Sequence, residues 1–470
     1  MALLPPPGSH VHLIGIGGAG MSAIARVLLG QGYRVTGSDR IASDLAAALV
    51  AEGAAVVVGH DAVNVAGAQA VLVTSAAAAD HIEVQAAREA GIPVYKRSEI
   101  VGDLTRGKKV IAIAGTAGKT TTTAMIAHLL ISLGRDPSYI VGGTLPMTGL
   151  NGRAGVGGEF VIEADEYDHM FLGLSPDVAV VTNLVWDHPD FFPTPQDMEN
   201  SFVQFSERIT PAGQLIVCGD DAGALRLART FTERRGGRRV GIYGGDPQAA
   251  GSFDSRALIE DLRVIEGSPA FDYVPTGAAR MTIRLSVPGR HNALNAAAAL
   301  TAVRTALDDR LDMPRAAAAL ASFGGAGRRF EIMGERDGVI VVDDYAHHPL
   351  KIRAALEAAR SRYPRHALWA VWQPHTFSRT QALWDDFIDC FSDADHVLVT
   401  PVYAARESPI SGIDGAGMAE AIARRHPDAR HVVSFDQASA LLLREARSPA
   451  VIMILSAGDA PRIGWMFLGT

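Results

Sequence analysis

Two glycine-rich loops, each between a short apolar segment and a helix-forming one, most constrain how this chain can fold. The first loop, at 15–20, reads GIGGAG, and the second, at 115–120, reads GTAGKT. A strand that passes through such a loop into a helix leaves backbone N–H groups and the positive end of the helix dipole free to hold a phosphate. The sequence therefore predicts that one chain binds two phosphorylated ligands, as an enzyme would that uses one of them to act on the other.

The order of the expected elements predicts three α/β domains in series. Short apolar strands alternate with alanine-rich helices, a pattern typical of parallel sheets with crossover helices. A basic, turn-prone stretch at 105–109 and a glycine-rich hinge at 324–327 separate three such segments. We therefore expect a Rossmann-like domain at 1–106, a central P-loop ATPase-type α/β domain at 107–323 and a Rossmann-like C-terminal domain at 324–470.

Apolar runs and their periodicity predict the individual elements. The expected strands lie at 11–14, 34–37, 55–58, 70–74, 110–114, 160–163, 178–182, 214–218, 331–333, 339–343, 367–371, 397–400, 431–434 and 451–455. The expected helices lie at 20–29, 43–52, 82–90, 291–307, 349–361 and 415–424, and one more follows the second loop and stops at Gly134. Alternating apolar and turn residues at 246–290 predict an antiparallel insertion on the central domain.

Composition and charge exclude several functional classes. A net charge of -8 with dispersed arginines argues against a nucleic-acid partner, which would require a basic face. The two cysteines, Cys218 and Cys390, have neither the number of a disulfide framework nor the spacing of metal ligands. Because the N-terminal residues lack a signal-peptide pattern and polar residues interrupt every apolar stretch, we expect a cytoplasmic protein without a membrane span.

Taken alone, the first loop leaves three interpretations open. Its glycine spacing matches the dinucleotide fingerprint. Asp39 ends the next strand, at the sequence spacing from the loop where such proteins have an acid that hydrogen-bonds the ribose. The ligand could then be a nicotinamide or flavin dinucleotide. A nucleotide diphosphate sugar would use the same N–H groups, and a tight strand-to-helix turn would need no ligand at all.

The second loop indicates ATP binding. Lys119 can neutralise the β and γ phosphates, and the Thr120 hydroxyl can reach a magnesium ion. Glu163 ends an apolar strand, a position where carboxylates hold divalent metals, although an acidic cluster there can equally be a solvated helix start. His188 follows the next strand, and its residue type favours a hydrogen-bonding role because Mg²⁺ prefers oxygen ligands.

Over nearly its whole length the chain resembles the Mur ligase family. The shared motifs occur in order: GIGGAGM at 15–21, GTxGKT at 115–120, EADE at 163–166, DH at 187–188, GRHN at 289–292, GRRF at 327–330, DDYxHHP at 343–349 and QPH at 373–375. The resemblance implies an enzyme that uses ATP and Mg²⁺ to join L-alanine to the lactyl carboxylate of UDP-N-acetylmuramate through an acyl phosphate, in peptidoglycan precursor synthesis. It removes the nicotinamide interpretation of the first loop, and it implies a monomer or a homodimer.

The resemblance also implies a role for each matching residue. The sugar nucleotide would be bound by Gly15, Gly17, Gly18, Ala19, Gly20, Met21, Ser38 and Asp39. ATP would be bound by Gly115, Thr116, Gly118, Lys119, Thr120, Thr121, His291, Asn295 and Arg329, and the metal by Thr120, Glu163 and His188. The incoming amino acid would be surrounded by Tyr345, His348, His375 and Arg379. Catalysis would depend on Lys119, Glu163, His188, Arg329 and His348.

Two features bear on the place of the chain within the family. Ala117 stands where relatives commonly have histidine, a change that bears on a contact near the phosphates or the acyl group and leaves Lys119 and Thr120 in place. No lysine occurs between Lys119 and Lys351, whereas several later-acting family members use a carbamylated lysine in the central domain to hold a second metal. This absence fits the first-step ligase and its peptide-recycling relative.

Two rival functions therefore stay open. A recycling ligase would join the same sugar nucleotide to a preformed tripeptide, and the EADEYD motif at 163–168 suits that group. The QPHTFSR motif at 373–379 is more similar to the alanine-adding enzymes. A nucleotide-binding relative altered in catalysis is the second rival, and Ala117 is its only hint.

Overall fold

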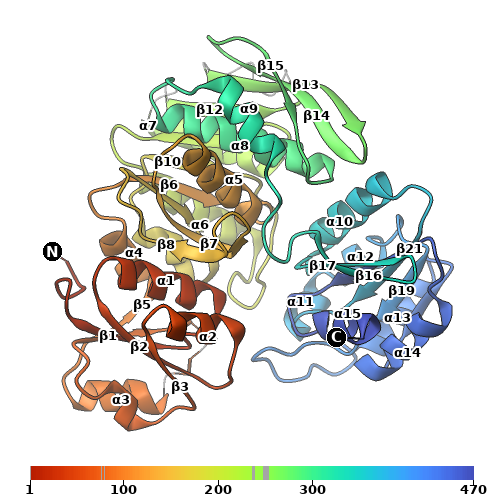
Figure 1. Ribbon diagram of the computed structural model, residues 1–470, viewed down its shortest axis with the longest axis horizontal. Helices are drawn as coiled ribbons and strands as arrows, with labels where there is room; N and C mark the ends of the chain where they lie inside the picture. Colours follow the sequence, from red (N-terminus) through yellow and green to blue (C-terminus); the bar gives the residue numbers. More distant parts are fainter. Residues whose placement is uncertain are drawn as a thin grey trace.

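The computed structural model describes residues 2–75, 77–78, 80–235, 239–246, 253 and 255–469. Figure 1 shows three lobes in chain order, with the N-terminal lobe in red and orange, the middle lobe in brown to green and the C-terminal lobe in blue. Within the described residues the lobes are built on sheets of five, ten and six strands. The expected α/β class with largely parallel sheets is confirmed, while the exact domain boundaries stay a prediction.

The N-terminal lobe is a parallel sheet of order β3-β2-β1-β4-β5. Its strands are β1 (His10–Ile14), β2 (Arg34–Asp39), β3 (Ala55–Val58), β4 (Ala70–Val73) and β5 (Val94–Lys96). Its helices are α1 (Ala19–Gly30), α2 (Asp44–Ala51), η1 (Ala62–Val65), α3 (Ile82–Glu89) and α4 (Arg97–Leu104). The strand order reverses at β1, so the first glycine loop lies at the switch point where α/β sheets bind ligands.

The middle lobe has the order β15-β14-β13-β12-β11-β10-β6-β9-β7-β8. Its strands are β6 (Lys109–Ala114), β7 (Ser138–Leu145), β8 (Leu150–Arg153), β9 (Glu159–Glu163), β10 (Val178–Val181), β11 (Gln214–Cys218), β12 (Val240–Gly244), β13 (Ser255–Ile265), β14 (Ser268–Pro275) and β15 (Met281–Arg284). Its helices are α5 (Lys119–Ser132), η2 (Tyr167–Gly173), α6 (Pro195–Glu207), α7 (Ala222–Arg235), α8 (Arg290–Ala306) and α9 (Met313–Ala321). The second loop again leaves a central strand, β6, between β10 and β9.

The expected antiparallel region is confirmed for β13, β14 and β15, which pair antiparallel with one another. These strands extend the central sheet, because β13 also pairs parallel with β12. Part of the expected region, 247–252 and 254, lies outside the described residues.

The C-terminal lobe has the order β16-β17-β21-β18-β19-β20, with only the β16–β17 pair antiparallel among its described strands. Its strands are β16 (Glu331–Arg336), β17 (Val339–Asp344), β18 (Ala367–Trp372), β19 (His396–Val399), β20 (Ala429–His431) and β21 (Ala450–Leu455). Its helices are α10 (Pro349–Arg362), α11 (Phe377–Ala382), α12 (Trp384–Ile388), α13 (Gly415–Ala423), α14 (Phe435–Glu445) and α15 (Pro461–Leu468). The strand expected at 431–434 is wrong beyond His431, because Ser434 instead caps α14 by accepting from Gln437 N.

The three lobes are joined in two different ways. One buried apolar cluster continues from the N-terminal lobe, for example Leu13 and Ile24, into the middle lobe at Phe160 and Phe171. The C-terminal lobe has its own buried clusters, and Trp186 of the middle lobe packs against one of them. Among the helices that the structure describes, none combines the length and apolar character needed to cross a membrane.

Candidate active site

The second glycine loop forms an open anion site between β6 and α5. Gly118 has φ +86°, directly precedes α5, and leaves the helix without a side-chain cap. A Cβ atom at this position would come within 2.6 Å of Asn295 Oδ1, so glycine is required by both backbone and space. The unpaired N–H groups of the first turn and the helix dipole are therefore available to a phosphate.

Ala117, the departure from the family pattern, is held by its backbone. Its N–H donates to Asn183 Oδ1 over 2.8 Å, and its carbonyl accepts from Asn183 Nδ2 over 3.0 Å and from Thr182 Oγ1 over 2.6 Å. These bonds from the end of β10 fix the loop without any side chain at 117. The conformation of the loop at this position therefore does not depend on a side chain at 117.

Lys119, the first residue of α5, is paired with acids. Its Nζ lies 2.8 Å from both carboxylate oxygens of the fully buried Glu166. Burial by itself would lower the pKa of Lys119, but the charges of Glu166, Asp165 and Glu163 outweigh burial and raise that pKa. The ammonium therefore stays charged at neutral pH, beside the helix terminus where a phosphate would sit.

An oxygen-rich group surrounds Thr120, the next residue of α5. Thr120 Oγ1 donates to Glu163 Oε1 over 3.0 Å and accepts from Arg329 Nη2 of the C-terminal lobe over 3.1 Å. Glu163 is the last residue of β9, and its other oxygen accepts from Gly142 N over 2.7 Å. A hydroxyl beside a carboxylate is the kind of donor set that Mg²⁺ prefers. These residues therefore fit the divalent cation that the resemblance implies.

His188 lies across from this group in a left-handed backbone conformation, with φ +56°. Its Nε2 is 3.7 Å from Glu166 Oε1, and its Nδ1 is 3.3 Å from Arg379 Nη2. The ring thus points toward the acid that pairs with Lys119 and is anchored by an arginine. The hydrogen-bonding role that its residue type favoured is present, and its role as a metal ligand stays a prediction.

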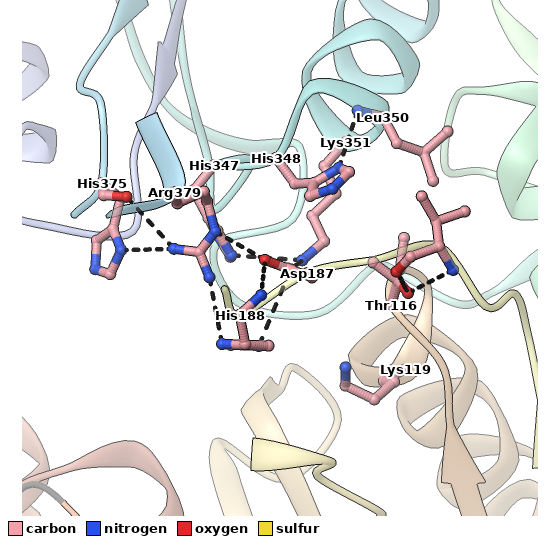
Figure 2. Close-up of polar contacts among 12 residues, drawn as sticks. Thr116, Lys119, Asp187, His188, His347, His348, Leu350, Lys351, His375 and Arg379 are labelled. Atoms are coloured by element: carbon pink, nitrogen blue, oxygen red, sulfur yellow. Dashed lines mark hydrogen bonds and ion pairs between the residues drawn. The ribbon is translucent and has the colours of Figure 1, made fainter. Parts of the chain in front are cut away.

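Asp187 joins the middle lobe to the C-terminal lobe. Its Oδ1 accepts from Arg379 Nε over 2.8 Å, and its Oδ2 lies 3.5 Å from Lys351 Nζ. Burial alone would raise the pKa of Asp187, but Arg379, His188 and Lys351 hold it well below its usual value. Figure 2 shows Arg379 and Lys351 reaching this carboxylate from different segments of the C-terminal lobe.

Three histidines of the C-terminal lobe surround this ion pair in neutral form. Burial lowers the pKa of His348 to about 4 and that of His375 to about 3, and it lowers the pKa of His347 well below its usual value. His348 caps α10 by accepting from Leu350 N, and its Nε2 lies 3.2 Å from the carbonyl of Trp186. Both nitrogens of His348 are therefore engaged in contacts that position α10, and its catalytic role stays a prediction.

The start of α8 forms another wall of the site. Burial lowers the pKa of His291 to about 4, so the ring is neutral. Asn295 accepts from Thr122 Oγ1 over 3.2 Å and donates to Asn292 Oδ1 over 3.0 Å. These contacts tie α8 to α5 behind the phosphate loop, where the resemblance places adenine contacts.

The first glycine loop is also uncapped, because Gly18 precedes α1 without a side-chain hydrogen bond to the helix. Asp39 Oδ2 accepts from Gly17 N over 2.9 Å and so braces the loop. Ser38 is fully buried and donates to Glu83 Oε2 over 2.6 Å. Neither side chain is free of internal contacts, and their roles in binding the sugar nucleotide stay predictions.

One cavity of about 1190 Å³ brings most of the expected residues together. It is lined by Ala19, Gly20, Thr116, Gly118, Lys119, Thr120, Thr121, Glu163, His188, His291, Asn295, Arg329, Tyr345, His375 and Arg379. Eight others do not line it: Gly15, Gly17, Gly18, Met21, Ser38, Asp39, Gly115 and His348. The cavity thus runs from the first helix of the N-terminal lobe past the phosphate loop to the C-terminal lobe.

Arg97, Glu166 and Lys351 are among the charged residues of this region to which sequence reasoning assigned no role. Arg97 approaches the first loop so closely that a Cβ atom at Gly20 would lie 2.7 Å from its Nη1. Glu166 pairs with Lys119, and Lys351 contacts Asp187. The EADE motif contained a signal for Glu166, whereas no local pattern indicated Arg97 or Lys351.

Models of known protein families match the chain in three consecutive parts. Residues 10–109 match the Mur ligase family catalytic domain, 113–303 the Mur ligase middle domain and 328–458 the Mur ligase glutamate ligase domain. The chain belongs to the Mur ligase family.

Individual relatives extend this result. UDP-N-acetylmuramate--L-alanine ligase of Roseiflexus sp. (strain RS-1) is 43% identical, with 98% of this chain and 99% of the relative covered. The enzyme of that name from Nitratidesulfovibrio vulgaris (strain DP4) is 42% identical, with 97% and 98% covered. Among solved structures, UDP-N-acetylmuramate-alanine ligase MurC from Thermotoga maritima is similar to this chain with a TM-score of 0.79 and 27% identity. A murein peptide ligase from Psychrobacter arcticus is similar with a TM-score of 0.72 and 26% identity. Each comparison covers 98% of both chains.

Proposed function

We propose that this protein is the ATP-dependent ligase that joins L-alanine to UDP-N-acetylmuramate in the cytoplasm. The observation that carries the proposal is the single cavity that joins an uncapped phosphate loop with Lys119 to a buried cationic group of the C-terminal lobe. Near full-length relatives with this named activity support it.

The reaction has two steps. A lactyl carboxylate oxygen of the sugar nucleotide attacks the γ phosphorus of ATP, and the bond to the bridging oxygen breaks to release ADP. The neutral amine of L-alanine then attacks the carbonyl carbon of the acyl phosphate, the C–O bond to the phosphoryl group breaks, and inorganic phosphate leaves with the proton that the nitrogen loses as the amide forms. The chain must therefore hold two anionic substrates side by side and keep water from the acyl phosphate.

The residues of the chain divide this work between the lobes. The uncapped N-terminus of α1 would hold the diphosphate of the sugar nucleotide, and that of α5 would hold the phosphates of ATP. Lys119 and Arg329 would neutralise charge that develops on the γ phosphoryl group, which is usually the largest contribution to such catalysis. Thr120, Glu163 and His188 would hold Mg²⁺, which when bound supplies further neutralisation of phosphate charge. Arg329 and Arg379, both from the C-terminal lobe, would close the site.

The test is ATP consumption by the purified protein. ADP release is measured with UDP-N-acetylmuramate, Mg²⁺ and one amine at a time: L-alanine, glycine, L-serine or the tripeptide. We expect the highest kcat/KM with L-alanine. A preference for the tripeptide would instead establish the recycling ligase, to which the match with the murein peptide ligase corresponds. No ATP consumption with any amine would leave only a nucleotide-binding relative.

A further inference from the structure

Lys351 is a partly buried lysine in the first turn of α10, with a side chain that is 16% exposed, and it points toward the cavity between the middle and C-terminal lobes (Figure 2). The positive end of the helix dipole makes this a poor place for a cation. No acidic residue occupies the same turn to offset it. The ammonium therefore stands where both burial and the helix dipole oppose its charge.

The hydrogen-bonding capacity of Lys351 is poorly used. Its Nζ lies 3.5 Å from Asp187 Oδ2 and 3.4 Å from His347 Nε2. By comparison, Lys119 Nζ is 2.8 Å from each oxygen of Glu166. An ammonium has three donors, so Lys351 has two long contacts and room for a further acceptor.

Charge in this part of the cavity is unbalanced. Arg379 and Lys351 share one carboxylate, Asp187, and Arg379 makes the shorter contact. The neighbouring rings of His347 and His375 are neutral and therefore do not offset the positive charge of Arg379 and Lys351. Burial lowers the pKa of Lys351 to about 8, with Asp187 opposing the shift and the nearby charges of Lys119 and Arg379 adding to it. A second anion bound here would relieve an excess of positive charge.

We propose that Lys351, together with Arg379, binds the α-carboxylate of the incoming amino acid and so selects a free amino acid. The inference rests on the proposed function. The other anion within reach is a phosphate of ATP, but that charge already faces Lys119 and the N-terminus of α5. Lys351 lies with Arg379, His347 and His375 on the C-terminal side, and among the described residues Asp187 is the acid that pairs with Lys351 and with Arg379.

The experiment compares L-alanine with L-alaninamide, which has the same amine but no carboxylate. Steady-state ADP release is measured for the wild type, Lys351→Met and Lys351→Arg. The wild type should prefer L-alanine by on the order of tenfold or more in kcat/KM, because a hydrogen bond to a charged partner is typically worth that much. Lys351→Met should raise KM for L-alanine by a similar factor and lose the preference. Lys351→Arg should keep most of the preference for L-alanine, since arginine keeps the positive charge.

Three results would overturn the inference. The first is that the wild type uses L-alaninamide and L-alanine with equal kcat/KM, a result that the wild type alone would show. Lys351→Met could keep its KM for L-alanine, or it could raise KM for ATP instead, which would assign the lysine to a phosphate. Thermal melting of each variant checks folding, and Lys351→Gln replaces Lys351→Met if the latter is unfolded. If the wild type consumes no ATP with L-alanine, the proposed function itself fails, so the two failures are distinguishable.

Discussion

Arg379 of the C-terminal lobe donates its Nε to Oδ1 of Asp187 in the middle lobe over 2.8 Å, and both side chains are almost completely buried. This ion pair lies in a polar contact between two lobes whose buried apolar clusters are distinct but are both contacted by Trp186. The N-terminal and middle lobes, by contrast, share one apolar cluster. We therefore expect the buried pair of Asp187 and Arg379 to contribute strongly to the association of the C-terminal lobe with the middle lobe.

Asp187→Asn should weaken that association. The change leaves Arg379 and Lys351 buried without a counter-charge, and breaking a buried pair in this way typically costs about 3–5 kcal/mol. We expect an expanded radius of gyration in small-angle X-ray scattering and a lower urea midpoint. Asp389→Asn is the matched control, because its pair with Arg425 is exposed and 3.5 Å long, and exposed pairs contribute about 1 kcal/mol or less. Equal behaviour of the two variants would contradict the electrostatic account.

Lys119→Ala should lower turnover by on the order of a hundredfold, since removing one preorganised charge contact to a transition state typically costs that much. ADP release with UDP-N-acetylmuramate and L-alanine measures the effect. Lys96→Ala removes a lysine that is 55% exposed and should leave turnover nearly unchanged. Near-normal ADP release from Lys119→Ala would refute its role at the phosphates.

The fold could be predicted where neighbouring residues alone determine an element. Short continuous apolar runs located the strands that precede both loops, since parallel strands buried on both faces are apolar along their length. The helix α6 was missed although Thr194 and Asp197 form a capping box at its start, a signal that could have found it. The strand expected at 431–434 failed because its apolar residues did not reveal that Ser434 would cap α14.

The site could be predicted only where a motif is local. Lys119 and Thr120 follow from one loop, but the contact between Lys351 and Asp187 joins positions 164 residues apart. Nothing near Lys351 in the chain indicates its burial or its shared carboxylate. Such a charge imbalance arises only when the C-terminal lobe meets the middle lobe, and it therefore needs the tertiary structure.

His188→Ala should raise the Mg²⁺ concentration that gives half-maximal activity, on the order of tenfold. The expected reason is loss of one ligand beside Glu163 and Thr120. A magnesium titration of ADP release at saturating ATP measures the shift. His396→Ala serves as control, because His396 pairs with Asp428 within the C-terminal lobe. An unchanged titration for His188→Ala would remove it from the metal site.

Glu83→Gln should flatten the acid dependence of stability. Burial alone would raise the pKa of Glu83, but the His12 ring 3.6 Å away and hydrogen bonds from Ser38 and Asn64 outweigh it and lower the pKa to about 2 from 4.5. A lowered carboxyl pKa stabilises the fold fully above about pH 4.5, and this contribution is lost as pH falls toward 2. Urea unfolding from pH 6 to pH 3 should therefore show a steeper loss for the wild type than for Glu83→Gln. The exposed Glu89→Gln on the same helix should follow the wild type, and parallel curves for all three would contradict the assignment.

Gly118→Ala and Gly134→Ala separate backbone strain from obstruction of the phosphate loop. Both glycines have positive φ, +86° and +80°, so alanine costs about 1–2 kcal/mol of stability at either position. Only at Gly118 does the new Cβ meet a neighbour, Asn295 Oδ1 at 2.6 Å, whereas nothing lies within 4 Å at Gly134. Titration calorimetry with ADP and Mg²⁺ should show affinity reduced by on the order of tenfold or more for Gly118→Ala, because the loop must shift to admit the methyl group. Gly134→Ala should melt at a lower temperature yet bind ADP as the wild type does. Equal affinities for the two variants would mean that the loop at 115–120 is not where the adenine nucleotide binds.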